Sequence, residues 1–461
     1  MSRKKVVLVL DECNGPSVYN PVSYTDFLSE SDQIDLIIIT SPKGLSESDK
    51  SKCLDYKEMD EPTTNGLMEV WALKFHEKHK IDMVYTKQED LILRAAHIRR
   101  ILGLTNGLLP DLAMIYRDKY LMKCKAQSGG FLVPAFARVY SPIDVLDFAG
   151  KHGYPVIVKP TLGQASSGVR VLKDSNDCEA YLQNEFFDRI NDRLMDYSGD
   201  LIIEKFVPSK MYHVNGYARN GKISIVWPFS YVSTNLDFTA GKAYGNVFIA
   251  KNEPVWEPLV NAAQKLLDIL TTPEHLIFHA ELFEVKQNDG SVGFALCEIA
   301  ARRPGGSIGL LIDEAEGGVG LFPEIEFRLN LGLNLRHDRE SISKMNSPCF
   351  GAADLMIPRQ LGKLVSLPDS ECPLPNMIYK PIAKAGTVYQ GFSVNTMNTA
   401  ARFIASAGQE RVSCQTMEAR LNAALAWFNR HVVYDRGDSG LEINSSPKIL
   451  PLDLNRRLTA N

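Results

Sequence analysis

The stretch HAELFEVKQNDGSVGFALCEIAARRPGG, residues 279–306, predicts a β-hairpin that carries two opposed acidic residues. Asp289 and Gly290 are the DG dipeptide that favours a two-residue turn between antiparallel strands. With that turn, Glu281 lies directly opposite Glu298, and their Cβ atoms are ~5 Å apart. Like charges in this position destabilise a sheet unless a positive group lies between them.

A bound cation is the interpretation that best accounts for this pair. In the same register, one face of the hairpin also carries Phe283, Val285, Phe294 and Leu296, so the acids lie at the end of a largely apolar surface. Mg²⁺ takes carboxylate oxygens and usually completes its shell with substrate phosphates, so the pair indicates a nucleotide site. The alternative is a slipped register in which one acid points to solvent and no ion is needed.

Two lysines upstream support a phosphate site. Lys159 ends the apolar strand YPVIVKP and precedes the loop GQASSG, residues 163–168. Glycines in such a loop free backbone amides to point at phosphate oxygens, and serines add hydroxyl donors. Lys119 lies on a predicted helix over 111–128, where the alternative is a solvated helix face. The loop residues expected at the phosphates are Gly163, Ser166, Ser167 and Gly168.

The chain of 461 residues, 45% hydrophobic and 23% charged, is long enough for several compact units. Short apolar strands alternating with helices predict a doubly wound α/β sheet over residues 1–108. We expect an α+β lobe over 109–207, a second lobe with the acidic hairpin over 208–345, and a final unit over 346–461. The last ~25 residues show no periodicity and are expected to form a loosely attached tail.

Composition excludes several function classes. A net charge of -4 without a long Lys/Arg run gives no expectation of a nucleic-acid partner. The sequence has no apolar window of ~18 residues and no signal-peptide core, so we expect no membrane association and a cytoplasmic location. The eight cysteines form no CxxC pair and the nine histidines no HExxH motif, which leaves carboxylates as the expected metal ligands.

The order of these features resembles the ATP-grasp superfamily, and within it the carboxylate-amine ligases that include the L-amino acid (dipeptide) ligases. The resemblance implies an ATP-grasp fold with a Rossmann-like N-terminal domain. It implies that Lys119, in the DK dipeptide, and Lys159 bind the phosphates of ATP while the Gly/Ser loop closes over them. Glu281 and Glu298 would hold Mg²⁺, or alternatively Mn²⁺, and Arg302, four residues after the second acid, would be catalytic together with Lys159.

The same resemblance implies an adenine-contacting hinge strand in the segment IIEKFV. Two departures from the family pattern concern the nucleotide site. Met211 stands near the position where many relatives place a glutamate on the ribose hydroxyls, and Ala300 stands where many have an asparagine metal ligand. Ribose recognition and the number of metal ions are therefore open. The residues expected at the base of the nucleotide are Glu204, Lys205, Phe206, Val207 and Phe283.

Residues beside the acids are candidates for contacts with the other substrates. His279 faces Ala300 in the predicted register and either touches substrate or packs so that it orients Glu281. The amides of Gly306 and Ser307 either hold a carboxylate or simply close a loop. For Arg303 we expect a role at the surface.

The expected function is ligation of a small carboxylate to an amine, such as an amino acid, through an acyl phosphate, with release of ADP and phosphate. A carboxylate needs activation because its oxygen is a poor leaving group, and phosphorylation supplies one. Two alternatives are a carboxylase-like enzyme that phosphorylates bicarbonate and a nucleotide-binding regulatory protein without turnover. A homodimer is slightly preferred over other assemblies.

Overall fold

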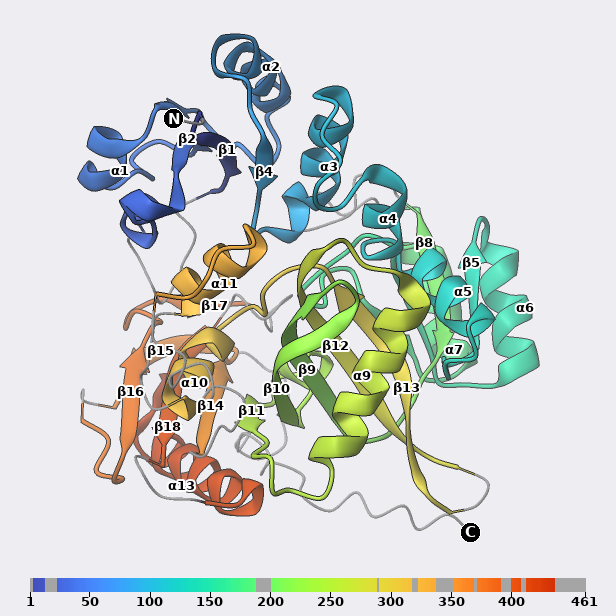
Figure 1. Cartoon of the computed structure of the whole chain (residues 1–461). Coiled ribbons are helices and arrows are strands. Elements are labelled where there is room, and N and C mark those ends of the chain that lie inside the picture. The colour runs from blue at the N-terminus through green and yellow to red at the C-terminus, as the bar shows by residue number, and fades with distance from the viewer. Residues whose placement is uncertain are drawn as a thin grey trace.

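The computed structural model describes residues 3–12, 23–187, 200–287, 290–316, 322–336, 351–368, 371–390, 399–407 and 412–435. Within these ranges the strands form four sheets (Figure 1). The Asp289 position of the expected turn and the expected C-terminal tail from residue 436 onward lie outside the described residues. In the described part of the chain, no helix is both long and apolar enough to cross a membrane.

The N-terminal unit is a parallel sheet with strand order β3-β2-β1-β4, as the alternation of strands and helices predicted. Three of its four strands are apolar runs with buried side chains, as in other doubly wound sheets, whereas the edge strand over residues 55–58 is polar and has no fully buried residue. The strands are β1 (Lys5–Leu10), β2 (Ile34–Thr40), β3 (Asp55–Glu58) and β4 (Met83–Tyr85). The helices are α1 (Glu47–Lys52), α2 (Leu67–His79) and α3 (Ile92–Ile101), with short 3-10 turns η1 (Thr25–Phe27), η2 (Glu30–Asp32) and η3 (Glu89–Leu91).

The single helix predicted over 111–128 is wrong, because the chain forms two helices there, α4 (Pro110–Ile115) and α5 (Lys119–Ser128). Asp118 separates them: its carboxylate accepts hydrogen bonds from the backbone N–H groups of Tyr120 and Leu121 at 2.8 and 3.0 Å. An aspartate in this position is an N-cap, which starts a new helix rather than continuing the previous one. Lys119 therefore occupies the first turn of α5.

The small lobe that follows is an antiparallel sheet with strand order β5-β8-β6-β7. Two helices, α6 (Pro142–His152) and α7 (Ser175–Asn184), pack against it through buried residues such as Val145, Phe148 and Cys178. The strands are β5 (Phe136–Val139), β6 (Val156–Pro160), β7 (Arg170–Leu172) and β8 (Leu201–Lys205).

The centre of the molecule is an eight-stranded sheet with strand order β13-β12-β9-β10-β11-β14-β18-β16. This sheet runs across the boundary expected at residues 345 and 346, so the final unit shares its hydrophobic core with the lobe before it. The strands are β9 (Met211–Arg219), β10 (Lys222–Ser233), β11 (Tyr244–Phe248), β12 (His275–Lys286), β13 (Val292–Ala300), β14 (Ala352–Pro358), β16 (Met377–Pro381) and β18 (Thr399–Ser406).

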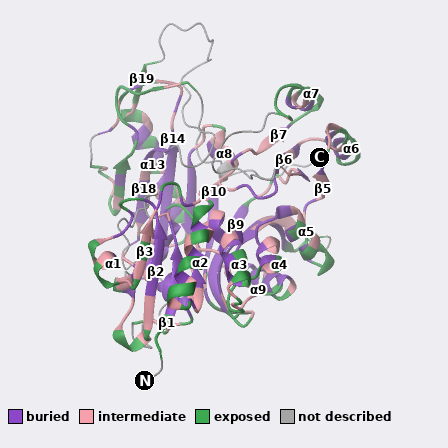
Figure 2. Ribbon diagram, turned by 90° about the horizontal axis from the view of Figure 1, so that it is seen from above, coloured by how far each residue is buried: buried purple, intermediate pink, exposed green. Residues whose placement is uncertain are grey.

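Helices cover both faces of the large sheet, and its strands are largely buried (Figure 2). Helices α5 and α9 (Trp256–Leu270) pack against one face, and α10 (Ile308–Ala315) and α11 (Phe322–Asn330) pack against the other. Helix α13 (Cys414–His431) covers the C-terminal strands. The remaining elements are helix α8 (Asn235–Thr239) and a three-stranded sheet of β15 (Gly362–Ser366), β17 (Val388–Tyr389) and β19 (Val433–Asp435).

The acidic hairpin has the predicted register at its open end but contains a β-bulge. Glu281 pairs with Glu298, whereas the next residue, Leu282, pairs with Leu296, so Cys297 is an extra residue in β13. The prediction that Phe294 and Leu296 share a face with Phe283 is therefore wrong. Both pack with Leu282 in the core on the opposite face, while Phe283 lies with Cys297 on the face of the acids.

Candidate active site

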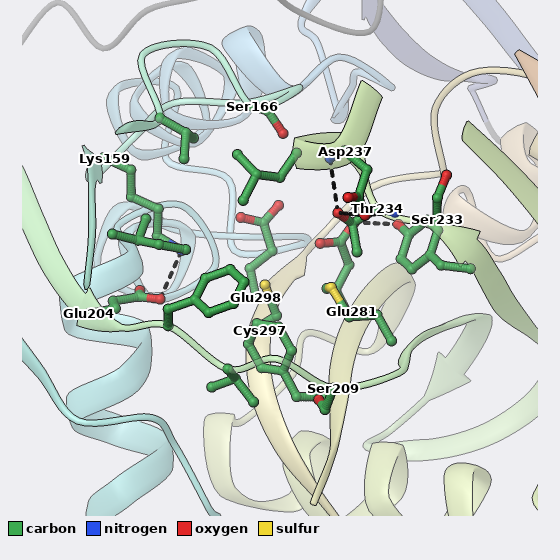
Figure 3. Close-up of a pocket in the computed structure, with 18 of the residues that line it drawn as sticks. Lys159, Ser166, Glu204, Ser209, Ser233, Thr234, Asp237, Glu281, Cys297 and Glu298 are labelled. Carbon is green, nitrogen blue, oxygen red and sulfur yellow. Dashed lines mark hydrogen bonds and ion pairs between the residues drawn. The ribbon is translucent and has the colours of Figure 1, made fainter. Parts of the chain in front are cut away.

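A cavity of about 500 Å³ lies between the small lobe and the large sheet, a size typical of small-molecule sites. Figure 3 shows Lys159 and Glu204 on one side of it, Thr234 and Asp237 on the other, and the acidic hairpin between them. Most of the residues that the sequence suggested meet in its wall. They are Lys119, Lys159, Ser166, Ser167, Glu204, Lys205, Phe206, Val207, Glu281, Phe283 and Glu298.

The two lysines are buried, and each is paired with an acid. Lys159 lies 3.0 Å from a carboxylate oxygen of Glu204, and Lys119 lies 3.0 Å from one of Glu298. Burial alone would lower the pKa of Lys159, but Glu204 more than offsets this and holds that pKa above its usual value. Both side chains line the same cavity.

The two acids on the hairpin are held by the protein's own donors. Tyr231 donates a hydrogen bond to Oε1 of Glu281, and His279 Nε2 lies 3.4 Å from the same oxygen. Burial alone would raise the pKa of Glu281, but His279 and Tyr231 together lower it. The repulsion between Glu281 and Glu298 is thus relieved by neighbouring side chains as well as by any ion.

The residues present fit a magnesium ion. Oε2 of Glu281 and Oε1 of Glu298 accept no hydrogen bond from the described residues, so each acid keeps one oxygen available to a cation. Within the described ranges, no group of three or more His, Cys, Asp or Glu side chains could hold a metal ion. An ion between these two acids would therefore complete its shell with phosphate oxygens and water, as Mg²⁺ usually does.

The Gly/Ser loop is tied to both neighbouring units. Gly163 accepts a hydrogen bond from Lys119 Nζ at 2.6 Å, and Gln164 Nε2 donates to the carboxylate of Asp90 in the N-terminal unit at 2.8 and 2.9 Å. Ala165 and Ser166 have φ angles of 52° and 60°, in the left-handed region that non-glycine residues rarely adopt. Such strain is typical of loops shaped for a ligand. Gly168, with φ 69°, shapes the loop but does not line the cavity.

The hinge segment lines the cavity, but two of its side chains are already engaged. Glu204 is paired with Lys159 and, at 3.4 Å, with Lys123. Lys205 Nζ donates to the backbone carbonyls of Gly153 and Tyr154 at 3.0 and 3.1 Å. The contacts that remain for a planar base are therefore backbone groups of this segment and the side chains of Phe206 and Val207.

Arg302 does not line the cavity among the described residues; it pairs with Glu89 of the N-terminal unit. Burial alone would raise the pKa of Glu89, but Arg117 and Arg302 lower it to about 2. Arg302 is still within electrostatic reach of the hairpin, because Glu298 and Glu281 are among the groups that raise its pKa. It joins the N-terminal unit to the strand that carries Glu298.

The remaining candidates lie beside the cavity rather than in its wall. His279 donates from Nδ1 to Asn215 Oδ1, 2.7 Å away, and this bond fixes the ring beside Glu281, which fits the orienting role. Ser307 is buried at the start of α10, next to exposed Gly306. The surface role expected for Arg303 is wrong, because its side chain is partly buried. Burial alone would lower the pKa of Arg303, but the nearby groups Glu326, Tyr85, Tyr24 and Asp11 raise it.

Sequence reasoning missed several residues in the cavity wall. Met211 lines the cavity as expected, and two further acids in its wall are Glu284 on β12, which accepts a hydrogen bond from Tyr212 at 2.7 Å, and Glu418 on α13. Glu418 comes from a helix that no local motif connects to this site. Other missed residues include Tyr231, Ser233, Thr234, Asp237, Lys242 and Cys297.

Comparison with known proteins identifies this architecture. Residues 152–310 match the family model of the ATP-grasp domain. The chain is 25% identical over 262 residues to the L-arginine-specific L-amino acid ligase of Bacillus subtilis. That alignment covers 56% of this chain and 60% of the relative, so the chain spans less than two thirds of that protein's length.

Solved structures give the same fold over nearly the whole chain. The L-amino acid ligase from Bacillus licheniformis has a TM-score of 0.65 at 13% identity, covering 94% of this chain and 100% of that one. The biotin carboxylase domain of the Hydrogenobacter thermophilus 2-oxoglutarate carboxylase, in complex with MgADP, ADP and bicarbonate, has a TM-score of 0.60 at 13% identity, covering 94% and 92%. At these identities the likeness shows the fold, which is the ATP-grasp fold with a parallel N-terminal sheet.

Proposed function

We propose that this chain, in which residues 152–310 match the ATP-grasp domain, is an ATP-dependent ligase that joins a small carboxylate to an amine through an acyl phosphate. The observation that carries the proposal is the convergence of two buried lysines, two acids and the Gly/Ser loop on one cavity. The substrates proposed are an amino acid or small carboxylic acid and a second amino acid. The name of the Bacillus subtilis relative supports amino acids as substrates.

Separate groups of residues in the cavity bind the phosphates, the base and the metal ion. Lys119, Lys159 and the amides of the Gly/Ser loop bind the phosphates of ATP, and the hinge segment binds the base. Glu281 and Glu298 hold magnesium, which when bound neutralises charge on the phosphoryl oxygens. The loop, tied to Asp90, shields the reacting carboxylate from water that would hydrolyse the activated group.

The proposed reaction has two steps. A carboxylate oxygen of the acid attacks the γ-phosphorus, and the bond to the β–γ bridging oxygen breaks, which gives the acyl phosphate and ADP. The amine nitrogen then attacks the acyl carbon and loses a proton, and inorganic phosphate leaves. The groups in the cavity suit attack at the γ-phosphorus because their positive charge is gathered where the terminal phosphates would lie.

The test is the fate of a labelled oxygen. With a substrate whose carboxylate carries ¹⁸O, one labelled oxygen is expected in each released phosphate, and ADP is the nucleotide product. Mass spectrometry of the phosphate and chromatography of the nucleotide measure both. Release of AMP and pyrophosphate, or label in AMP, would contradict the proposed chemistry.

A carboxylase-like reaction is the second candidate, because the fold is also similar to the biotin carboxylase domain. It predicts ADP formation that depends on bicarbonate and not on an added amino acid. A nucleotide-binding regulatory protein predicts ATP binding with neither dependence. The same assay, run with and without each addition, separates the three.

For Arg302, which is paired with Glu89 and lies within electrostatic reach of Glu298, we propose a role in stabilising the transferring phosphoryl group. Arg302→Met is expected to lower kcat by roughly 100-fold, the scale for loss of one preorganised donor, and to change ATP affinity by less than threefold. Steady-state kinetics and calorimetry measure the two effects. Arg100→Met, on an exposed residue of α3, is the control. An equal loss of ATP affinity and turnover would mean that Arg302 contributes to the binding of ATP and not specifically to the transition state.

A further inference from the structure

Lys123 is the most deeply buried lysine near the cavity, yet it does not line it. It lies on α5, one turn after Lys119, and its side chain is 0% exposed. A charged ammonium without partners in such a place would be very unfavourable. Its partners therefore explain why the position carries a lysine rather than an apolar residue.

Two of its partners belong to the bulge in β13. Lys123 Nζ donates to the backbone carbonyls of Leu296 and Cys297 at 3.0 and 2.8 Å. β13 is an edge strand of the eight-stranded sheet, and among the described residues its outer side has only an isolated β-bridge between Ala295 and Leu132, so no described strand pairs with the carbonyls of Leu296 and Cys297 there. The ammonium takes the place of such a strand at the bulge, where the ladder of backbone hydrogen bonds is disrupted.

The bulge matters because it decides where the second acid points. Cys297 is the extra residue, and the register changes between Glu281 and Leu282. Because side chains alternate along a strand, one extra residue lets Leu296 point into the core while Glu298 points into the cavity. Lys123 thus binds the backbone immediately before Glu298.

The third partner of Lys123 lies on β8, in the small lobe. Its Nζ lies 3.4 Å from Oε1 of Glu204, and the other oxygen of Glu204 lies 3.0 Å from Lys159. Burial alone would raise the pKa of Glu204, but Lys123 and then Lys159 hold it below its usual value. Lys123 and Lys159 therefore share one buried carboxylate.

We propose that Lys123 is a positioning residue that sets both halves of the active site, Glu298 through the bulge carbonyls and Lys159 through Glu204. The inference rests on the proposed function, because it assigns Glu298 to magnesium and Lys159 to the phosphates. It adds to that function one buried ammonium, outside the cavity wall, whose two hydrogen bonds and one ion pair connect the strand of the metal acid to the carboxylate that binds the phosphate lysine.

The test compares Lys123→Met with Lys125→Met. Methionine keeps most of the length of the lysine but donates no hydrogen bond, and Lys125 is an exposed residue of the same helix. Lys123→Met removes the hydrogen bonds to the carbonyls of residues 296 and 297, so the backbone before Glu298 is held less rigidly. The affinity for Mn²⁺, which serves as a magnetic probe in place of Mg²⁺, should therefore fall by at least about tenfold. Turnover should fall by about 100-fold at saturating metal. The reason is that Glu204, without the charge of Lys123, binds Lys159 more strongly and leaves its ammonium less available to the phosphates. Lys125→Met should match the wild type in both.

Metal binding is measured by electron paramagnetic resonance with a non-hydrolysable ATP analogue, so this readout does not depend on turnover. If the wild type binds neither the analogue nor Mn²⁺, the proposed function fails. If the wild type binds both and Lys123→Met binds them equally well, the positioning role fails and the proposed function stands.

A second variant separates positioning from simple charge balance. Lys123→Met/Glu204→Gln removes the buried ammonium and its carboxylate together, so it restores folding if Lys123→Met alone is unstable. If Lys123 only neutralises Glu204, the double variant regains the Mn²⁺ affinity of the wild type, which would overturn the proposal. If Lys123 positions the bulge, the weak Mn²⁺ binding persists.

Discussion

Glu298→Gln is expected to abolish measurable turnover, with a loss of about 1,000-fold or more, while the chain stays folded. The substitution removes the negative charge that holds magnesium but keeps an oxygen that can accept from Lys119, which lies 3.0 Å from the carboxylate. A preorganised charge at the transferring group is worth several kcal/mol in the transition state. The free energy of unfolding without ligand should fall by only about 1 to 2 kcal/mol. The loss is small because the amide oxygen of glutamine can still accept a hydrogen bond from Lys119, although the ion pair is gone.

Turnover, Mn²⁺ affinity and a urea denaturation curve measure these three effects. Glu274→Gln is the matched control, because Glu274 is an exposed acid just before β12 and lies far along the strand from Glu281. A Glu298→Gln protein that loses most of its stability in the absence of ligand would indicate a structural role for the carboxylate. Retained turnover would remove Glu298 from the metal site.

Lys159→Met should have the second largest effect, on nucleotide binding. The ammonium faces the cavity and is buried, so its interaction with phosphate is weakly screened by solvent. Loss of one such contact is expected to weaken ATP binding by about 2 to 3 kcal/mol, or roughly 30- to 150-fold. Stability should also fall, because Glu204 keeps only Lys123, at 3.4 Å, as a charged partner.

Calorimetric titration with ATP measures the affinity, and Lys173→Met, on an exposed residue after β7, is the control. Lys159→Met/Glu204→Gln should recover part of the lost stability, because the buried carboxylate is gone, but none of the lost affinity. Recovery of ATP binding in the double variant would mean that Lys159 serves only to neutralise Glu204. Unchanged affinity in the single variant would remove the proposed phosphate site.

Local patterns in the sequence were sufficient to predict the fold class and a core set of the residues that meet in the cavity. Lys159 at the end of an apolar strand, the Gly/Ser loop after it and the opposed acids of the hairpin all reflect short-range rules of strand alternation and turn chemistry. The order of these motifs along the chain then predicted the ATP-grasp fold, which the comparisons confirm. Lys119 was predicted too, although not the cap at Asp118 that places it.

Only the tertiary structure determined how these residues are held. The backbone carbonyl of Cys297, at the bulge, accepts a hydrogen bond from Lys123, 174 residues away, and no local sequence pattern predicts a contact between such distant positions. Arg302 lies 213 residues from Glu89, the acid that it binds, and Glu418 reaches the cavity from a helix near the C-terminus. The sequence by itself therefore determined which side chains are present and which face of a strand they favour. Packing between units decided their charge partners, because ion pairs and edge-strand contacts depend on distances that only the folded chain sets.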